Sequence, residues 1–232
     1  EEEKHALTDK FYDWVIYLMA PIQYSLLALF LYGLMTQDLA WHEVLGRIVT
    51  FGISCVVLGI NVGHELGHRV KPHERILAKA LLLSSQYMHF IIEHNKGHHK
   101  NVATPLDPAS ARKGEMIYMF WIRSISGSYV SAWNLEKKRL QKDGKPILAF
   151  SNQMLQFLVL QILLVGTIVF AAGGVVLLCY LASALMGILF FETVNYLEHY
   201  GLTRKKKENG NYERVLPIHS WNSNHALGRV IL

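Results

Sequence analysis

The sequence predicts an all-α integral membrane protein, a helical bundle whose interfacial and cytoplasmic helices carry a histidine-rich metal site. Three observations lead to this prediction. Of the 232 residues, 51% are hydrophobic and only 18% are charged, whereas about a quarter of the residues of a soluble domain are charged. Several apolar runs are long enough to cross a hydrocarbon core about 30 Å thick. The twelve histidines include pairs at helical spacing close to the ends of such runs.

Four apolar runs are expected to span the bilayer. The first, residues 14–35, has no formally charged residue, and its Pro21 is tolerated where neighbouring groups satisfy the freed carbonyl. The other three are residues 44–63, 154–172 and 175–197. The tight turn AAGGV joins the last two runs. We expect a single membrane-embedded catalytic domain over residues 1–232.

The two cysteines and the ends of the chain limit which cofactors and which boundaries the protein is expected to have. Cys55 and Cys179 lie inside apolar runs, where cysteine usually packs as a small hydrophobic residue. The sequence contains no CxxC motif, which excludes a four-cysteine iron–sulfur centre and a CxxCH haem site built from this chain alone. The chain lacks an initiator Met and stops in an apolar run, so we expect a segment of a longer protein, truncated at both ends.

The distribution of Lys and Arg predicts the orientation in the membrane. Residues 64–147 contain 14 Lys and Arg against 7 Asp and Glu, and residues 199–232 contain 6 against 2. The connections on the other side, residues 36–43 and the AAGGV turn, contain no Lys or Arg. The positive-inside rule therefore places the two basic segments, with the histidine clusters, at the cytoplasmic face.

One further apolar stretch, residues 76–92, could be counted as a fifth span. A crossing there would leave the later histidines across the bilayer from His64 and His68. We therefore expect a break near Ser84–Ser85, after a helix that lies along the interface. The aromatic stretch 116–133 is interrupted by an arginine and is also expected to be interfacial.

The arrangement of the histidines carries most of the functional information. His64 and His68, in HELGH, are spaced i, i+4 on one helix face, so both can bind one ion. The stretch EHNKGHH repeats this spacing and adds a histidine about 100° further round the helix. The candidate metal ligands are His64, His68, His94, His98, His99 and His199.

Six imidazoles exceed the needs of one tetrahedral zinc and fit two ions with open positions. Ligand softness alone leaves iron, zinc, copper and nickel open. A ligating imidazole usually donates its other N–H to a carboxylate or carbonyl. The candidates for that role are Glu65, Glu93 and Glu198. Each is expected to serve a histidine of another helix, because adjacent side chains on a helix diverge by about 100°. His219 and His225, in HSWNSNH, are ambiguous.

The motifs HELGH, EHNKGHHKNVATPLDPAS and NYLEHYGL resemble those of the membrane-bound alkane monooxygenases, the AlkB-type alkane 1-hydroxylases. With xylene monooxygenases and fatty acyl desaturases, these form the integral-membrane, histidine-rich di-iron enzymes. The resemblance runs from about residue 14 to the end, and the ATPLDPAS continuation and the EHYG motif favour an alkane hydroxylase over a desaturase. It implies that the six candidate histidines are iron ligands. The family's third histidine box should follow HSWNSNH, so the remaining ligands are expected beyond Leu232.

The resemblance implies O2-dependent hydroxylation of medium-chain alkanes to primary alcohols at two non-heme iron ions. Electrons would come from a rubredoxin-type donor, and the basic cytoplasmic face suits an acidic one. The expected location is the bacterial inner (cytoplasmic) membrane, with the metal site toward the cytoplasm and no nucleic-acid partner. An apolar slot would present the alkane end to the metals. Its candidate lining residues are Ile22, Leu26, Leu29, Phe30, Ile53, Val57 and Ile60.

Other functions fit parts of the pattern. A membrane zinc metalloprotease explains HELGH, with Glu65 as general base, but leaves EHNKGHH and His199 without a role. It also requires a later Asp ligand, and neither of the last two apolar runs contains an Asp. A fatty acyl desaturase or a xylene monooxygenase-like oxygenase uses the same metals with a different box spacing. A metal carrier would hold its ligands near the bilayer midplane, whereas these histidines collect at helix ends.

Overall fold

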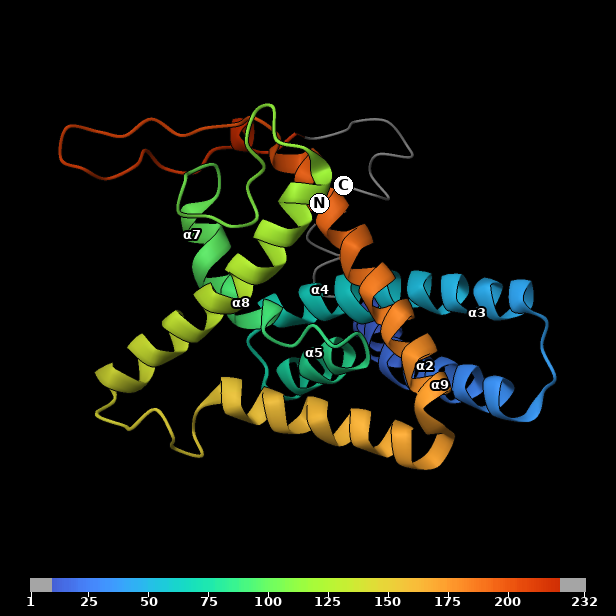
Figure 1. Ribbon diagram of the computed structural model, residues 1–232. Coiled ribbons are helices and arrows are strands. Elements are labelled where there is room, and N and C mark those ends of the chain that lie inside the picture. The colour runs from blue at the N-terminus through green and yellow to red at the C-terminus, as the bar shows by residue number, and fades with distance from the viewer. Residues whose placement is uncertain (1–9, 222–232) are drawn as a thin grey trace. The chain divides into compact units, whose positions relative to one another are not determined.

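The structure is a computed structural model that describes residues 10–221. These residues form two compact units (Figure 1). The first unit comprises residues 10–88 and 160–188, and the second comprises residues 89–159 and 189–221. Within the described residues, three helical segments are long and apolar enough to cross a membrane, and the predicted all-α membrane fold is confirmed. The third segment contains both of the last two apolar runs, 154–172 and 175–197, within one broken helix.

The first unit starts with two of these three segments. Helix α2 (Lys10–Thr36) contains the expected first span, and a short loop joins it to α3 (Trp41–Ser54), which packs beside it (Figure 1). Helix α3 continues through a π-helix, η1 (Cys55–Asn61), into α4 (Val62–His68), so the second segment runs from Trp41 to His68.

Helix α9 (Gln153–His199) is the third segment, and its residues belong to both units. Its first turn is capped by Asn152, whose Oδ1 accepts hydrogen bonds from the backbone N–H groups of Met154 and Leu155. The helix breaks at Gly173, where φ is +83°. Glycine adopts this conformation without a steric penalty, and it lies in AAGGV, between the two apolar runs expected there.

Helix α5 (Pro72–Ser84) ends where the sequence predicts a break. The carbonyl of Ser84, at its last residue, accepts a hydrogen bond from the Tyr180 hydroxyl at 3.0 Å. The next hydroxyl, that of Ser85, donates to the carbonyl of Cys55 in the π-helix, also at 3.0 Å. Both bonds satisfy backbone oxygens in a part of the molecule where water is scarce.

The core of the first unit is apolar with one polar inclusion. Phe30 stacks on Phe51, with ring centroids 4.7 Å apart, and Cys55 is fully buried beside them. The inclusion is the buried amide of Gln23, which donates to Ser84 Oγ at 3.1 Å and accepts from Ser54 Oγ at 2.5 Å. A buried amide is costly unless both its ends are hydrogen-bonded, so these serines fix how α2, α3 and α5 pack.

The second unit is built around a broken helical segment and one long helix. Helix α6 (Phe90–Glu93), the π-helix η2 (His94–His98) and α7 (His99–Asn101) follow one another without a gap. Residues of α6 and η2 pack against α8 (Ile117–Lys142), which contains most of the aromatic stretch 116–133. A single 3-10 turn, η3 (Pro217–His219), lies near the end of the described chain.

The loop between α7 and α8 is held in place by Arg123 of α8. Its guanidinium donates to the carbonyls of Pro108 and Ser110, at 2.9 and 3.1 Å. It also donates to both carboxylate oxygens of Glu115, each at 2.7 Å. One side chain thus fixes the conformation of a loop that has little regular secondary structure of its own.

The close packing of α9 on α3 can be tested at Gly187. A Cβ there would lie 2.7 Å from Cys55 Cβ and 3.0 Å from the carbonyl oxygen of Gly52. We therefore expect Gly187→Ala to lower the free energy of unfolding by about 1–3 kcal/mol, as overpacked sites do. Thermal unfolding of the purified protein in detergent measures the change.

The matched control is Gly166→Ala in the same helix, where a Cβ would meet nothing within 4 Å. Alanine favours a helix over glycine by up to about 1 kcal/mol, so this variant should be neutral or slightly more stable. Equal stabilities of the two variants would contradict a close approach of the helices at Gly187.

Candidate metal centre

The first unit contains one pair of candidate ligands, His64 and His68. His64 and His68 lie one turn apart in α4, with their Nε2 atoms 2.8 Å apart and their ring centroids 4.5 Å apart. Two nitrogen ligands about 2.1 Å from one ion, in neighbouring coordination positions, lie about 3 Å from each other. The spacing of these two nitrogens therefore fits a shared metal ion.

The end of α4 is fixed by an ion-pair cluster centred on Arg69, the residue that follows His68. Its guanidinium contacts the carboxylate of Asp13 and lies 3.2 Å from that of Glu74. Glu74 is buried and also accepts a 2.6 Å hydrogen bond from the Tyr17 hydroxyl. Burial alone would raise the pKa of Glu74, but the bonds from Tyr17 and Arg69 outweigh it and hold the pKa below its usual value.

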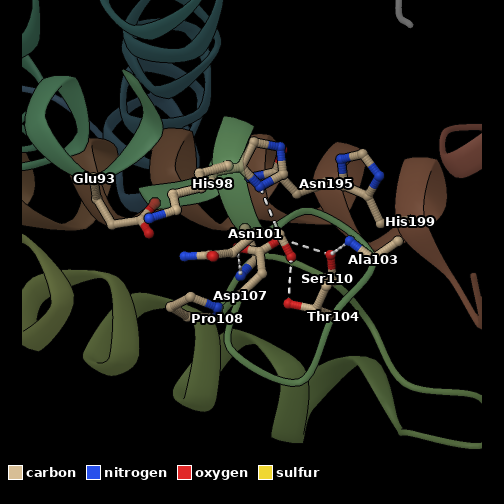
Figure 2. Close-up of polar contacts among 12 residues, drawn as sticks. Glu93, His98, Asn101, Ala103, Thr104, Asp107, Pro108, Ser110, Asn195 and His199 are labelled. Carbon is tan, nitrogen blue, oxygen red and sulfur yellow. Dashed lines mark hydrogen bonds and ion pairs between the residues drawn. The ribbon is translucent and has the colours of Figure 1, made fainter. Parts of the chain in front are cut away.

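The second unit brings the other four candidate ligands together. The ring centroids of His94 and His99 lie 4.5 Å apart, and those of His94 and His98 lie 5.1 Å apart. His199, at the end of α9, packs beside His98 with a centroid distance of 4.9 Å (Figure 2). His94 and His99 each offer a ring nitrogen within 4.8 Å of the other. Four neighbouring imidazoles without a thiolate match the ligand set of a divalent transition metal, and this chemistry fits iron, zinc, copper and nickel alike.

The three glutamates considered as partners of the ligands differ in position. Glu65 is exposed and pairs with Arg69 at 3.5 Å. Glu198 Oε2 lies 4.0 Å from Nε2 of its neighbour His199, beyond hydrogen-bond distance. Glu93 is buried, and Ser131 Oγ donates to it at 3.4 Å. Burial, with the charge of Asp107, raises the pKa of Glu93 to about 7.

A carboxylate that the sequence analysis did not identify makes the close contact instead. Asp107, in the loop after α7, places Oδ2 2.9 Å from Nδ1 of His98 (Figure 2). Burial alone would lower the pKa of His98, but the carboxylate outweighs it and raises the pKa above its usual value. For Asp107, burial alone would raise the pKa, and the hydrogen bond with His98 lowers it below its usual range. In the sequence, Asp107 lies in the ATPLDPAS run, nine positions after His98. It is not at i±3 or i±4 from any histidine, so helical spacing does not pair it with one.

Two further polar residues of α9 lie buried in the second unit. Glu192 accepts a hydrogen bond from Ser124 Oγ at 2.5 Å and one from the amide of Asn195 at 3.4 Å. Glu192 is not apparent from the sequence, because it is the single acidic residue of the apolar run 175–197, with no histidine at i±3 or i±4. The hydrogen bond between Ser124 of α8 and Glu192 joins α8 to the last turns of α9, in addition to the apolar contacts between them.

The ambiguous histidines are partly explained by local structure. His219 is buried; its Nδ1 accepts from the backbone N–H of Leu216 at 2.9 Å, and its Nε2 lies 3.4 Å from the carboxylate of Glu213. Both ring nitrogens therefore serve the local turn. Its carbonyl lies 3.3 Å from Nδ1 of His199, so a metal ion could bind His199 only through Nε2. His225 lies outside the described residues.

The candidate channel residues fall on different faces of their helices. Phe30 and Ile60 are buried, whereas Leu26, Leu29, Ile53 and Val57 are exposed. Ile22 is half-buried. Leu26, Leu29 and Phe30 line a groove of about 370 Å³ in the first unit, with α3 as its other wall.

Comparison with known proteins shows the family to which these motifs belong. The model of the fatty acid desaturase family matches residues 39–232. This match covers most of the chain, so the chain belongs to the fatty acid desaturase family.

Several proteins with similar sequences are named as monooxygenases. The chain is 40% identical over 224 residues to alkane 1-monooxygenase of Ectopseudomonas oleovorans, a match to 97% of this chain and 56% of that protein. It is 41% identical over 224 residues to alkane 1-monooxygenase 1 of Alcanivorax borkumensis, with 97% and 55% covered. It is 29% identical over 215 residues to the xylene/toluene monooxygenase hydroxylase component XylM of Pseudomonas putida, with 91% and 57% covered.

The chain spans about half the length of the curated relatives it matches. Their names confirm the resemblance to alkane monooxygenases that the histidine motifs indicate.

The ion-pair cluster at the end of α4 predicts a pH dependence of stability. The pKa of Glu74 is lower in the folded protein than its ordinary value of 4.5. Its stabilising contribution is therefore complete above pH 4.5 and is lost as the pH falls toward the folded pKa. We expect Glu74→Gln to lower the free energy of unfolding at neutral pH by about 1–3 kcal/mol, as for hydrogen bonds to a buried charge.

Denaturant unfolding of wild type and variant from pH 7 to pH 3 measures this difference, which should shrink with acidification. The control is Glu208→Gln, at an exposed position outside the cluster, which should leave stability unchanged at every pH. A wild-type advantage that grows as the pH falls would contradict the assignment.

Proposed function

We propose that this chain forms much of the catalytic part of an O2-dependent alkane monooxygenase that converts medium-chain alkanes to primary alcohols. The observation that carries the proposal is the similarity to alkane 1-monooxygenases over 97% of the chain. The clustering of imidazoles within each unit supports it, since each cluster offers nitrogens at metal-binding separations.

The proposed cofactor is a pair of non-heme iron ions. The proposed ligands from this chain are His64, His68, His94, His98, His99 and His199. Bound ferrous ions would supply the activation of O2. The chain's own contribution is to hold ring nitrogens in place and to keep water from the buried rings of His94, His98 and His199.

The apolar residues of α2 and of the segment Trp41–His68 are proposed to guide the alkane. Alkanes dissolve in the bilayer, so a route that opens toward lipid suits the exposed positions as well as the buried ones. The proposed lining is Ile22, Leu26, Leu29, Phe30, Ile53, Val57 and Ile60.

The proposed electron donor is a small acidic protein of the rubredoxin type, which would approach from the cytoplasm. Lys205, Lys206 and Lys207 form an exposed basic run after α9, and such a run attracts an acidic protein at low ionic strength. The proposed location is the inner membrane of a bacterium, with these residues on the cytoplasmic side.

A related oxygenase reaction is the second candidate. The matching family model is that of fatty acid desaturases, and one relative is a xylene/toluene monooxygenase component. The identity of the product separates these readings: a primary alcohol from octane, a benzylic alcohol from xylene, or a double bond in a fatty acyl chain.

The test is metal analysis followed by a turnover assay on the full-length protein. We expect about two irons per chain with little zinc, and formation of 1-octanol from octane when a rubredoxin, its reductase and O2 are supplied. A single zinc per chain, without iron, would contradict the proposal and return HELGH to a zinc site.

A matched pair of histidine variants tests the ligand assignment. His68→Gln removes a proposed ligand, and we expect it to lose iron and to lower activity more than about 100-fold, since even partners of ligands are worth 10–100-fold. His42→Gln changes an exposed histidine of the same helical segment and should keep the wild-type iron content. Equal iron content in the two variants would remove His68 from the ligand set.

A further inference from the structure

The side chain of Asp107 is fully buried in the second unit, against one ring nitrogen of His98. Its side chain has no exposed surface, and that of His98 is 8% exposed. The distance between Oδ2 and Nδ1 is 2.9 Å, which is that of a charge-assisted hydrogen bond (Figure 2). Both carboxylate oxygens already accept hydrogen bonds, from the backbone N–H of Ala109 and the hydroxyl of Ser110, so the carboxylate is the acceptor here and Nδ1 of His98 is the donor.

The orientation of the carboxylate is fixed by its other contacts. Oδ1 accepts the backbone N–H of Ala109 at 3.1 Å. Oδ2 also accepts the hydroxyl of Ser110 at 2.6 Å, and that hydroxyl oxygen in turn accepts the backbone N–H of Ala103 at 2.8 Å. Hydrogen bonds therefore hold the carboxylate on both of its oxygens.

We propose that Asp107 is a positioning residue that keeps the proton of His98 on Nδ1 and so presents the lone pair of Nε2 to the metal. The inference rests on the proposed role of His98 as an iron ligand. A histidine can ligate through one nitrogen only if that nitrogen is unprotonated, and the hydrogen bond of the other nitrogen decides which one that is.

The hydrogen-bond pattern gives Asp107→Asn an unusual consequence. The Ala109 N–H requires an acceptor, so the amide oxygen takes the place of Oδ1. The amide NH2 then replaces Oδ2 and points at Nδ1 of His98, and Ser110 Oγ can accept its second proton. The donated hydrogen bond favours an unprotonated Nδ1 and moves the ring proton to Nε2, where it blocks ligation.

Asp107→Ala has a different consequence. A cavity of about 160 Å³, lined in part by Thr104, Asp107 and Ser110, adjoins the carboxylate. This volume is large enough for water, which can donate to Nδ1 or accept from it. Removal of the carboxylate therefore leaves both ring tautomers populated, and part of the protein keeps Nε2 free.

The two Asp107 variants are expected to differ in iron affinity in an order opposite to the one that a purely structural residue would give. We expect Asp107→Asn to weaken iron binding by roughly 10–100-fold, the range found for partners of metal-ligating histidines. We expect Asp107→Ala to weaken it less than Asp107→Asn does. A residue that only fills space and holds the loop would show the opposite order, because Asn keeps the shape and Ala does not.

The experiment has two readouts on the full-length protein in detergent. Nitrogen NMR of 15N-histidine-labelled, metal-free protein reports which ring nitrogen of His98 is protonated, with His98→Gln used to assign the signal. Competition with an iron chelator gives the iron affinity. We expect Nδ1 to be protonated in the wild type, unprotonated in Asp107→Asn and mixed in Asp107→Ala.

Glu136→Gln is the matched control. Glu136 is a fully buried carboxylate of the same unit, but its partners are Arg139 and the backbone N–H of Gln153 rather than a histidine. This variant should lose stability and keep the wild-type iron affinity. A loss of iron affinity equal to that of Asp107→Asn would overturn the proposal.

An unprotonated Nδ1 in the wild type would overturn the proposal even if no variant could be purified. Wild-type iron affinity in Asp107→Asn would overturn it as well. Absence of iron binding by the wild type would contradict the proposed function instead, and the NMR measurement on metal-free protein would still report the role of Asp107.

Discussion

The contact between the buried carboxylate of Asp107 and the imidazole of His98 is the interaction around which the second unit is arranged. A carboxylate removed from water remains ionised only when hydrogen bonds replace its hydration. Here a histidine ring, a serine hydroxyl and a backbone N–H do so. Arg123 binds the carbonyls of Pro108 and Ser110, on either side of the Ala109 N–H donor, so the loop, its aspartate and the ring are constrained together. The position of the His98 ring, a candidate ligand, is thereby linked to α8, a helix that contains none of the candidate histidines.

The first unit meets the same requirement in apolar surroundings. Gln23 has its amide hydrogen-bonded at both ends by serines, and the carbonyl at the end of α5 is capped by the hydroxyl of Tyr180. Lipid offers no hydrogen bonds, so each polar group must be satisfied by another part of the chain. These bonds specify which faces of the helices meet more strictly than leucine packing does, because a slipped register would leave an amide without partners. Arg69 does the same at the end of α4, where the first histidine pair lies.

The parts of the fold that local sequence determines were predictable. The absence of charge over a membrane thickness marks the apolar helices, glycines mark the break at Gly173, and i, i+4 spacing marks the histidine pairs. Asp107 was not predictable in this way. It stands nine positions after His98 in an irregular loop, and the side chain that folds this loop comes from α8. The sequence favoured Glu65 as a partner of a histidine, because it lies next to His64, but its carboxylate pairs with Arg69.

Neither π-helix follows from the apolar pattern, yet both lie at the histidines. η1 ends just before His64, and η2 runs from His94 to His98. A π turn takes up one residue more than an α turn, so it rotates everything after it relative to everything before it. In α4, the face that carries the histidines is therefore out of phase with the exposed apolar residues of α3, Leu45, Val49 and Ile53. A helical wheel drawn through the whole segment Trp41–His68 would therefore superimpose two faces that the protein keeps apart.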